Sequence, residues 1–548
     1  MPFSRGASAP SRAAGHATKT PEVQEPAAIA IAIEEFLALH PKAVVLEDGR
    51  AVFEMQTAKY SLTTEHGRCT LQLWSEAANL VRRVVATRLR EGVLRMSVLR
   101  FGQSKPTSLE LVAHRDRRTP SDRESLRTRY LRVLERVLQR GFHEWTLESV
   151  SSAMDLEKSF GPAYARGRLV QGQRAWALVA VNEEETQATI DGALTVGILW
   201  LDRCRTQGDG RRVWQGLKVI VPHGTAALLV SRMAWLNEHA AQWELWELDQ
   251  QTEELTRRDP ADYGNLATQV VRAPNHAAVR ERFADAANRV MMLVPEPMRN
   301  EVEQVVRGGN EIAFLRHGLE FARVRAGYAG TSFNMQEQIT VGAGANETPL
   351  ATETEPTLRE FVARLFERRR VDGDKRDPLF RMQTERWLES VLRRNVTVLD
   401  EHLHPEYVYT QVPAFAAGDR GMLDLLGVLD DGRLAVIELK AEEDLQLALQ
   451  GLDYWVRVRW HHRQTTDDAT RPSYGLGEFQ RLGYFDGAAL SQEAPKLYLV
   501  APALRVHPAT EIVLRYLSPQ VEWELVGLDE RWRQSLKPVW RKRSSDPR

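Results

Sequence analysis

The chain has 548 residues, with 73 Lys and Arg residues against 74 Asp and Glu residues. This length is too great for one hydrophobic core and predicts roughly three or four domains. The near balance of charge excludes a protein that holds nucleic acid through a basic field over its whole surface, and leaves only local patches. The two cysteines, Cys69 and Cys204, exclude a disulfide framework or a multi-cysteine zinc site and predict a cytoplasmic protein. No apolar run is long enough to cross a membrane, so no membrane partner is expected.

The N-terminal part of the chain predicts a tail and a small folded module. Residues 1–28 are rich in Ala, Ser and Pro, which favours a disordered tail over the alternative of an organellar transit peptide. Residues 29–40 have the apolar spacing of a short amphipathic helix, and alternating strands with turn signals follow. We therefore expect a small α+β module over residues 29–118.

An internal repeat follows this module. Residues 119–250 read as a helix and a short hairpin, then as helix, strand, helix and strand. The same order of elements recurs in the last third of the chain, and the letters Trp-Glu-Leu recur with it at residues 243–245 and 523–525. The repeat predicts two copies of one α/β fold, and chance agreement between common βα patterns is the alternative.

The region between the two copies predicts a connector and a linker. Residues 251–326 read mostly as helices, with amphipathic runs at 277–292 and 301–306, and we expect a helical connector. Residues 327–356 are rich in Gly, Thr, Ala, Asn and Glu and lack periodicity, which predicts a flexible linker. A further helix then opens the last domain, residues 357–548.

The most informative stretch lies in this last domain. Two apolar runs, Met422–Leu429 and Arg433–Leu439, flank Asp-Asp-Gly and predict a β-hairpin with its glycine at positive φ. A three-residue loop places Asp424 opposite Glu438, whereas a two-residue loop separates these carboxylates. Glu438 and Lys440 share a face because side chains alternate along a strand. We favour the three-residue loop, since Asp, Glu and Lys are tolerated in a buried strand pair only where they converge.

Two carboxylates with one lysine are the groups that metal-assisted hydrolysis of a phosphodiester needs. Asp424 and Glu438 offer oxygen ligands for Mg²⁺ or Mn²⁺, and such an ion polarises the phosphate and lowers the pKa of a bound water. Lys440 would position or activate that water and offset the developing charge. The alternative is a salt bridge between Glu438 and Lys440 at a strand end, which leaves Asp424 unexplained inside an apolar run.

This arrangement resembles the PD-(D/E)XK nuclease superfamily. The matching residues are Asp424, then Glu438, Leu439 and Lys440, then Gln450 and Tyr454 as a Q-x-x-x-Y motif, with Glu385 on the preceding helix. The proline that often precedes the first acid is absent, and Leu423 stands there. The resemblance implies a restriction-endonuclease-like αβββαβ core with a mixed sheet, in which the Leu439 carbonyl completes the metal shell and Glu385 supports the metal or its waters. It also implies DNA as the substrate, with RNA as the alternative.

The helix that follows the hairpin carries the two residues of the Q-x-x-x-Y motif. Gln450 and Tyr454 are four residues apart and therefore share one helix face. Gln450 would hydrogen-bond the substrate backbone or a site carboxylate, and Tyr454 would hold the phosphate or Lys440. A core tyrosine beside Trp455 explains Tyr454 equally well, and the sequence leaves both readings open.

The earlier copy lacks these chemical groups. Aligned by element, it has Ala180 in the place of Glu438, Asn182 in that of Lys440, and Val170 near that of Asp424. Because alanine and valine cannot hold a metal ion, residues 119–250 are expected to form a degenerate copy that serves as a platform for binding or dimerisation.

The last domain therefore predicts a divalent-metal-dependent nuclease that hydrolyses phosphodiester bonds of DNA. The alternative is a non-catalytic nucleic-acid- or protein-binding module that retains a relic of the site. The chain has no Walker P-loop, so a motor would have to come from a helicase partner, and a homodimer is a further expected assembly. DNA repair and defence against foreign DNA are both open. The predicted segments are a tail (1–28), an α+β module (29–118), a degenerate nuclease-like α/β domain (119–250), a helical connector (251–326), a linker (327–356) and a nuclease domain (357–548).

Overall fold

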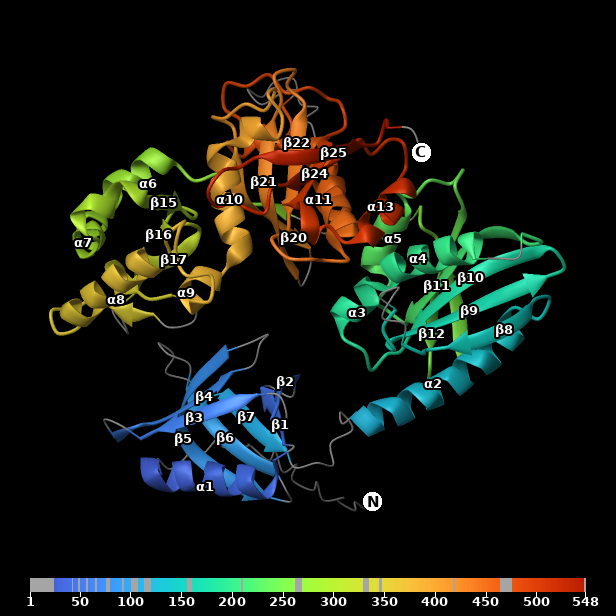
Figure 1. Cartoon of the computed structure of the whole chain (residues 1–548), viewed down its shortest axis with the longest axis horizontal. Helices are drawn as coiled ribbons and strands as arrows, with labels where there is room; N and C mark the ends of the chain where they lie inside the picture. Colours follow the sequence, from blue (N-terminus) through green and yellow to red (C-terminus); the bar gives the residue numbers. More distant parts are fainter. Residues whose placement is uncertain are drawn as a thin grey trace, which may run out of the picture. The chain divides into compact units, whose positions relative to one another are not determined.

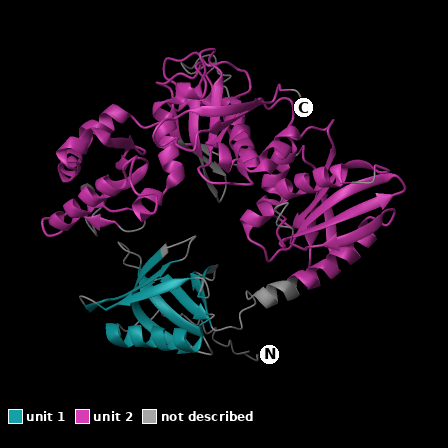
Figure 2. Cartoon of the chain, viewed as in Figure 1, with its two compact units in different colours: residues 1–124 teal, residues 125–548 magenta. Residues whose placement is uncertain are grey.

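The computed structural model describes most of the chain between residues 24 and 546. The described residues are 24–41, 43–47, 50–55, 58–64, 67–74, 79–90, 93–99, 107–112, 120–154, 160–207, 210–261, 269–328, 335–343, 347–416, 419–463 and 476–546. Most of the predicted tail lies outside the described residues, so that prediction stays untested. The chain divides into two compact units, residues 1–124 and 125–548 (Figure 2).

Unit 1 is an antiparallel sheet with one helix packed on it. Its elements are α1 (Pro26–Leu39), β1 (Val44–Glu47), β2 (Arg50–Glu54), β3 (Lys59–Thr63), β4 (Cys69–Trp74), β5 (Asn79–Arg90), β6 (Val93–Leu99) and β7 (Thr107–Val112). The strands lie in the order β2-β1-β7-β6-β5-β4-β3. Alternate residues of β4, such as Leu71 and Leu73, face α1 and share a core with Ile33 and Phe36. Unit 1 thus combines one helix with an antiparallel sheet, and the bounds predicted for the α+β module, residues 29–118, stay a prediction.

The first sheet of unit 2 is a mixed sheet covered by helices on both faces. Its elements are α2 (Pro120–Gly141), β8 (Thr146–Ser151), β9 (Tyr164–Gln171), β10 (Arg174–Val181), α3 (Gln187–Asp191), α4 (Ala193–Thr206), β11 (Val213–Pro222), α5 (Ala227–Met233), β12 (Gln242–Asp249) and β13 (Glu254–Arg258). The order is β13-β12-β11-β10-β9-β8, with β10, β11 and β12 parallel and the outer pairs antiparallel. Because helices cover both faces, β10 is buried at every residue after Arg174.

The second sheet of unit 2 lies in the C-terminal region. Its elements are β14 (Gln269–Val270), α9 (Pro378–Arg381), α10 (Thr384–Arg394), η4 (Val396–Val398), β20 (Tyr409–Ala416), β21 (Asp419–Val428), β22 (Leu434–Leu439), α11 (Leu447–His462), α12 (Glu478–Arg481), β23 (Lys496–Pro502), η5 (Ala503–Arg505), α13 (Pro508–Arg515), β24 (Trp523–Leu528) and β25 (Pro538–Arg543). The order is β14-β20-β21-β22-β23-β24-β25. Helix α10 packs on one face and α11 on the other (Figure 1). The predicted order of helix, three strands, helix and strand is present from α10 to β23.

These two sheets of unit 2 repeat one another strand by strand. From β8 in the first sheet and from β20 in the second, two antiparallel pairs are followed by two parallel pairs and a final antiparallel pair. The second sheet has one further strand, β14, which pairs antiparallel with β20. Their registers agree as well, because Leu217 pairs with Trp243 as Leu497 pairs with Trp523. The element-by-element match predicted for the two regions is therefore present in the described residues.

The region between these sheets differs from the prediction. It contains α6 (His276–Arg282), α7 (Ala284–Leu293), η3 (Glu296–Glu301), β15 (Val302–Val306), β16 (Glu311–Arg316), β17 (Leu319–Tyr328), β18 (Met335–Val341), β19 (Thr348–Pro349) and α8 (Glu355–Arg368). The five strands form an antiparallel sheet. The helix predicted at 301–306 is wrong, because that run is strand β15, and the linker predicted at 327–356 contains β18 and β19. Only the helices predicted at 277–292 and from residue 357 are found in place, as α6, α7 and α8.

The described chain is thus a mixed α/β protein with several sheets, as the fold class predicted at its coarsest level. None of its described helices is long and apolar enough to span a membrane.

Candidate active site

The hairpin that carries the acids has the predicted three-residue loop. Val428 pairs with Leu434, and this register places Asp424 across from Glu438. Gly432 closes the loop at φ 81°, a left-handed conformation that glycine adopts without a steric penalty. Both features of the predicted hairpin are confirmed.

The acids and the lysine meet at the C-terminal end of β22. The Glu438 side chain is 2 % exposed, and its Oε1 lies 3.4 Å from Lys440 Nζ. The backbone N–H of Leu439 donates a hydrogen bond of 3.1 Å to Asp424 Oδ2. The structure therefore brings the three residues of the predicted motif together in a largely buried position.

This burial changes the ionisation of all three groups. Burial, followed by the charge of Asp424, raises the pKa of Glu438 well above its ordinary range. Burial also raises the pKa of Asp424, against the opposing effects of the Leu439 N–H and Lys440. Burial alone would lower the pKa of Lys440, but the surrounding carboxylates outweigh it and raise that pKa. Lys440 is therefore a fixed positive charge at neutral pH, and it does not fully offset the effect of burial on the two acids.

Two buried side-chain oxygens, one on β22 and one on α11, lack a hydrogen-bond donor among the described residues. They are Glu438 Oε2 and Gln450 Oε1. Helix α11 packs closely on β22 here, since a Cβ built on Gly451 would lie 3.6 Å from Glu438 Cβ. Unpaired buried oxygens are costly, so each indicates a missing partner such as a cation or water.

Tyr454 lies one turn further along α11. Burial, and then the charges of Glu438 and Asp424, raise its pKa. The tyrosine thus keeps its proton and can act as a hydrogen-bond donor. It also packs against the core of the two sheets, as the alternative reading of the sequence proposed.

Glu385 stands at the mouth of the site, in the first turn of α10. Its side chain is 48 % exposed and its Oε1 lies 3.9 Å from Lys440 Nζ. Burial raises its pKa, with Asp424 adding to this and Lys440 opposing it. A cavity of about 480 Å³ opens here, lined by Arg381, Gln383, Thr384, Glu385, Arg386, Glu389, Asp424 and Glu442.

Sequence reasoning missed three acids of this site, Glu389, Glu442 and Asp444, and Glu442 lines the cavity. Asp444 Oδ2 lies 4.0 Å from Lys440 Nζ, and Glu389 lines the cavity while accepting a 2.6 Å ion pair from Arg386. For Glu389 the signal was its spacing, because it follows Glu385 by four positions on helix α10. Glu442 and Asp444 lie between β22 and α11, where spacing gives no signal.

The donor set fits a divalent cation with few protein ligands. Among the described residues, no group of three or more His, Cys, Asp or Glu side chains is arranged to hold a metal ion. The candidate ligands are therefore the carboxylates of Asp424 and Glu438 with the Leu439 carbonyl. Hard cations such as Mg²⁺ prefer oxygen and retain several waters, so a small ligand set of this kind, with an unpaired oxygen on Glu438, is suitable.

The corresponding place in the first sheet holds different residues from those predicted. The matched leucines of the two sheets are Leu217 on β11 and Leu497 on β23. Two residues beyond them lie Val219, which pairs with Val179, and Leu499, which pairs with Glu438. Val179 therefore takes the place of Glu438, and Val181 that of Lys440. The prediction of Ala180 and Asn182 is wrong by one residue, a slip that moves each to the opposite face of the strand.

The place of Asp424 in the first sheet is also corrected. Arg166 pairs with Val179, whereas Val170 pairs with Ala175 far from this position. Arg166 is 6 % exposed, and its guanidinium lies 4.6 Å from the centroid of the Phe160 ring. The first sheet thus has an arginine and two valines where the second has two acids and a lysine.

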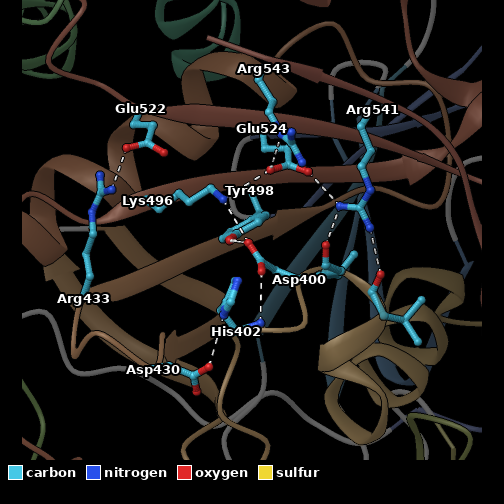
Figure 3. Close-up of polar contacts among 12 residues, drawn as sticks. Asp400, His402, Asp430, Arg433, Lys496, Tyr498, Glu522, Glu524, Arg541 and Arg543 are labelled. Atoms are coloured by element: carbon cyan, nitrogen blue, oxygen red, sulfur yellow. Dashed lines mark hydrogen bonds and ion pairs between the residues drawn. The ribbon is translucent and has the colours of Figure 1, made fainter. Parts of the chain in front are cut away.

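A second polar cluster lies at the opposite end of the second sheet (Figure 3). Asp400 accepts hydrogen bonds of 3.0 Å from Lys496 Nζ and 2.5 Å from Tyr498 Oη. Glu524 is 1 % exposed, with ion pairs of 3.3 Å to Lys496 and 2.7 Å to Arg541. Here burial is outweighed by cations and hydrogen bonds, so the pKa values of Asp400 and Glu524 are lowered. These acids are satisfied by the protein itself, unlike Asp424 and Glu438.

Comparison with known proteins finds no matching family model, no matching curated protein and no matching solved structure.

Proposed function

We propose that the last third of the chain is a divalent-metal-dependent phosphodiesterase that hydrolyses DNA, built on a restriction-endonuclease-like fold. RNA is the alternative substrate. The observation that carries the proposal is the Asp424–Glu438 pair. The two acids face each other and have raised pKa values, and Glu438 Oε2 accepts no hydrogen bond from the described residues. A bound cation would compensate both carboxylates. Residues 119–250 would be a degenerate copy of the same fold.

Each residue of the site has a role in this proposal. Asp424, Glu438 and the Leu439 carbonyl would hold Mg²⁺ or Mn²⁺, which when bound supplies a Lewis acid for the phosphate and lowers the pKa of water. Lys440, fixed beside Glu438, orients the nucleophile and offsets charge that develops on the phosphate. Glu385 orients water at the open mouth of the cavity.

The two residues on α11 would act on the buried side of the site. Gln450 Oε1 has no donor from the described residues and would accept a hydrogen bond from water at the acid pair. Tyr454, held in its protonated form, would donate to a phosphate or carboxylate oxygen.

A relic binding module is the second candidate, and one observation favours it. The described residues contain no cluster of three ligating side chains, so the metal would depend on only two carboxylates and a carbonyl. In that case the protein would bind nucleic acid or protein without cutting.

Digestion of single- and double-stranded DNA and RNA separates these candidates. The phosphodiesterase cuts with Mg²⁺ or Mn²⁺ and stops when EDTA removes the ion. Retained binding without cleavage of any of these substrates, in either metal, would support the relic module instead.

A further inference from the structure

The two α/β sheets of unit 2 are joined through a shared helical layer. Helices α4 and α5 of the first copy pack with α11 and α13 of the second in one continuous hydrophobic cluster. At its centre the rings of Trp235 and Trp455 meet edge to face, with centroids 4.8 Å apart. The two copies therefore form one body with a common core.

The contact between the copies has the pattern of a two-fold axis. Leu236 and Leu517, which follow equivalent helices α5 and α13, form an isolated antiparallel bridge. Reciprocal contacts of this kind are the mark of an isologous interface, as found between two subunits of a symmetric dimer. The flanking residues exchange two backbone hydrogen bonds of 2.8 Å, from Asn237 N–H to Tyr516 O and from Ser518 N–H to Trp235 O.

One buried ion pair breaks the two-fold symmetry of this interface. Arg232 of α5 donates two hydrogen bonds to Asp453 of α11, of 2.8 and 2.7 Å, and the side chains are only 4 % and 10 % exposed. Counted back from the bridge, Val513 holds on α13 the place that Arg232 holds on α5. A second copy of the C-terminal half docked in the same way would set Asp453 against Val513, leaving a buried carboxylate without a cation. The face thus fits the first copy of the same chain better than another C-terminal half.

The two-fold axis relates the acid-bearing site of the second sheet to the equivalent position of the first sheet, which lacks acids. Asp424 and Glu438 stand on the second sheet, and Arg166 and Val179 hold their places on the first. A two-fold symmetric nuclease with acids at both sites can cut both strands of a duplex in one encounter. This chain has acids at only one of the two equivalent positions.

We propose that the chain works as a monomer that nicks one strand of duplex DNA per encounter, with its first α/β copy occupying the face that a second subunit would need. This inference rests on the proposed function. It replaces the expected homodimer with a dimer-like arrangement inside one chain.

The test is cleavage of a supercoiled plasmid by the full chain with Mn²⁺ or Mg²⁺, together with analytical ultracentrifugation at the same protein concentrations. We expect open circles to accumulate before linear molecules, an initial rate proportional to protein concentration, and sedimentation as a monomer. Addition of an excess of Lys440→Ala protein should leave the ratio of open circles to linear molecules unchanged.

Two results would overturn the inference in distinguishable ways. Linear molecules that appear together with the first open circles, or a rate that rises with the square of protein concentration, would contradict single-strand nicking while leaving the nuclease proposal in place. The absence of any cleavage, with EDTA-treated and metal-loaded samples alike, would overturn the nuclease proposal and this inference with it.

Discussion

The two α/β sheets of unit 2 share a strand order and a register but differ in what they bury at one end. The first sheet holds Val179 and Val181 with an arginine across from them, and the second holds Glu438 and Lys440 with an aspartate across. The first sheet shows that this fold closes without acids at these positions. Because buried acids of like charge destabilise a core, the acids of the second sheet need a compensating partner that the first sheet does not need.

The largest effect is expected where the two copies meet. Arg232→Met would leave Asp453 buried without its cation and lower the free energy of unfolding by about 3 to 5 kcal/mol. Chemical denaturation measures this. Replacing both partners, as Arg232→Met with Asp453→Leu, should regain most of the loss. A double variant as unstable as the sum of the two single variants would show that the pair does not couple the copies.

Lys440→Ala should nearly abolish cleavage while leaving the fold and nucleic-acid affinity largely intact. The expected loss is about 10²- to 10³-fold in kcat, because the lysine acts on charge in the transition state. The matched control is Val181→Ala, the same position of the first sheet, which should reduce stability but retain kcat. Full activity of Lys440→Ala would remove the role assigned to this residue.

The two acid clusters of the second sheet should respond to pH with opposite signs. The lowered pKa values of Asp400 and Glu524 give stability that is present above their ordinary pKa range and is lost as the pH falls through their lowered values. The raised pKa of Glu438 gives stability that is present at low pH and is lost as the pH rises through its raised value.

Melting temperatures of two matched variants test this contrast. In the metal-free protein at neutral pH, Glu438→Gln should raise the melting temperature, because it removes repulsion with Asp424. Glu524→Gln should lower it, because three cations, Lys496, Arg541 and Arg543, lose a charged partner. Shifts of the same sign in both variants would contradict the contrast.

The smallest effect is expected from unit 1. A chain that lacks residues 1–118 should keep metal-dependent cleavage with kcat changed by less than about twofold, because unit 1 has its own core and supplies none of the assigned site residues. Steady-state kinetics on duplex DNA measure this. A large loss of kcat would place part of the chemistry in unit 1.

The hairpin and its register could be predicted because two separate features of the sequence constrained them. Asp-Asp-Gly set the loop, and the need for Asp424 to meet Glu438 chose between two loop lengths. The first copy offered no such check. Its loop is shorter, since Gln171 pairs with Arg174, and without buried acids to align, the prediction slipped by one residue.

The sheet formed by β15 to β19 could not be recognised for a different reason. Residues 301–306 fit a helical and an alternating pattern equally well, and a run this short does not decide between them. Strand β18 is rich in polar residues and is stabilised by pairing with β17, and β19 is stabilised by pairing with β18. The local sequence of residues 327–356 does not reveal these partners. The acid Glu389 was visible only as a spacing of four residues from Glu385 on α10, and Asp444 lies between β22 and α11, where spacing gives no signal.

Titration calorimetry with Mn²⁺ tests the central claim most directly, since that claim is that Asp424 and Glu438 form a cation site. The wild-type protein should bind the ion, and Asp424→Asn should weaken the affinity by at least about tenfold. Asp400→Asn is the control, because its acid already has protein partners at the other end of the sheet, and its affinity should match the wild type. Equal affinity in the wild type and in Asp424→Asn would contradict the account.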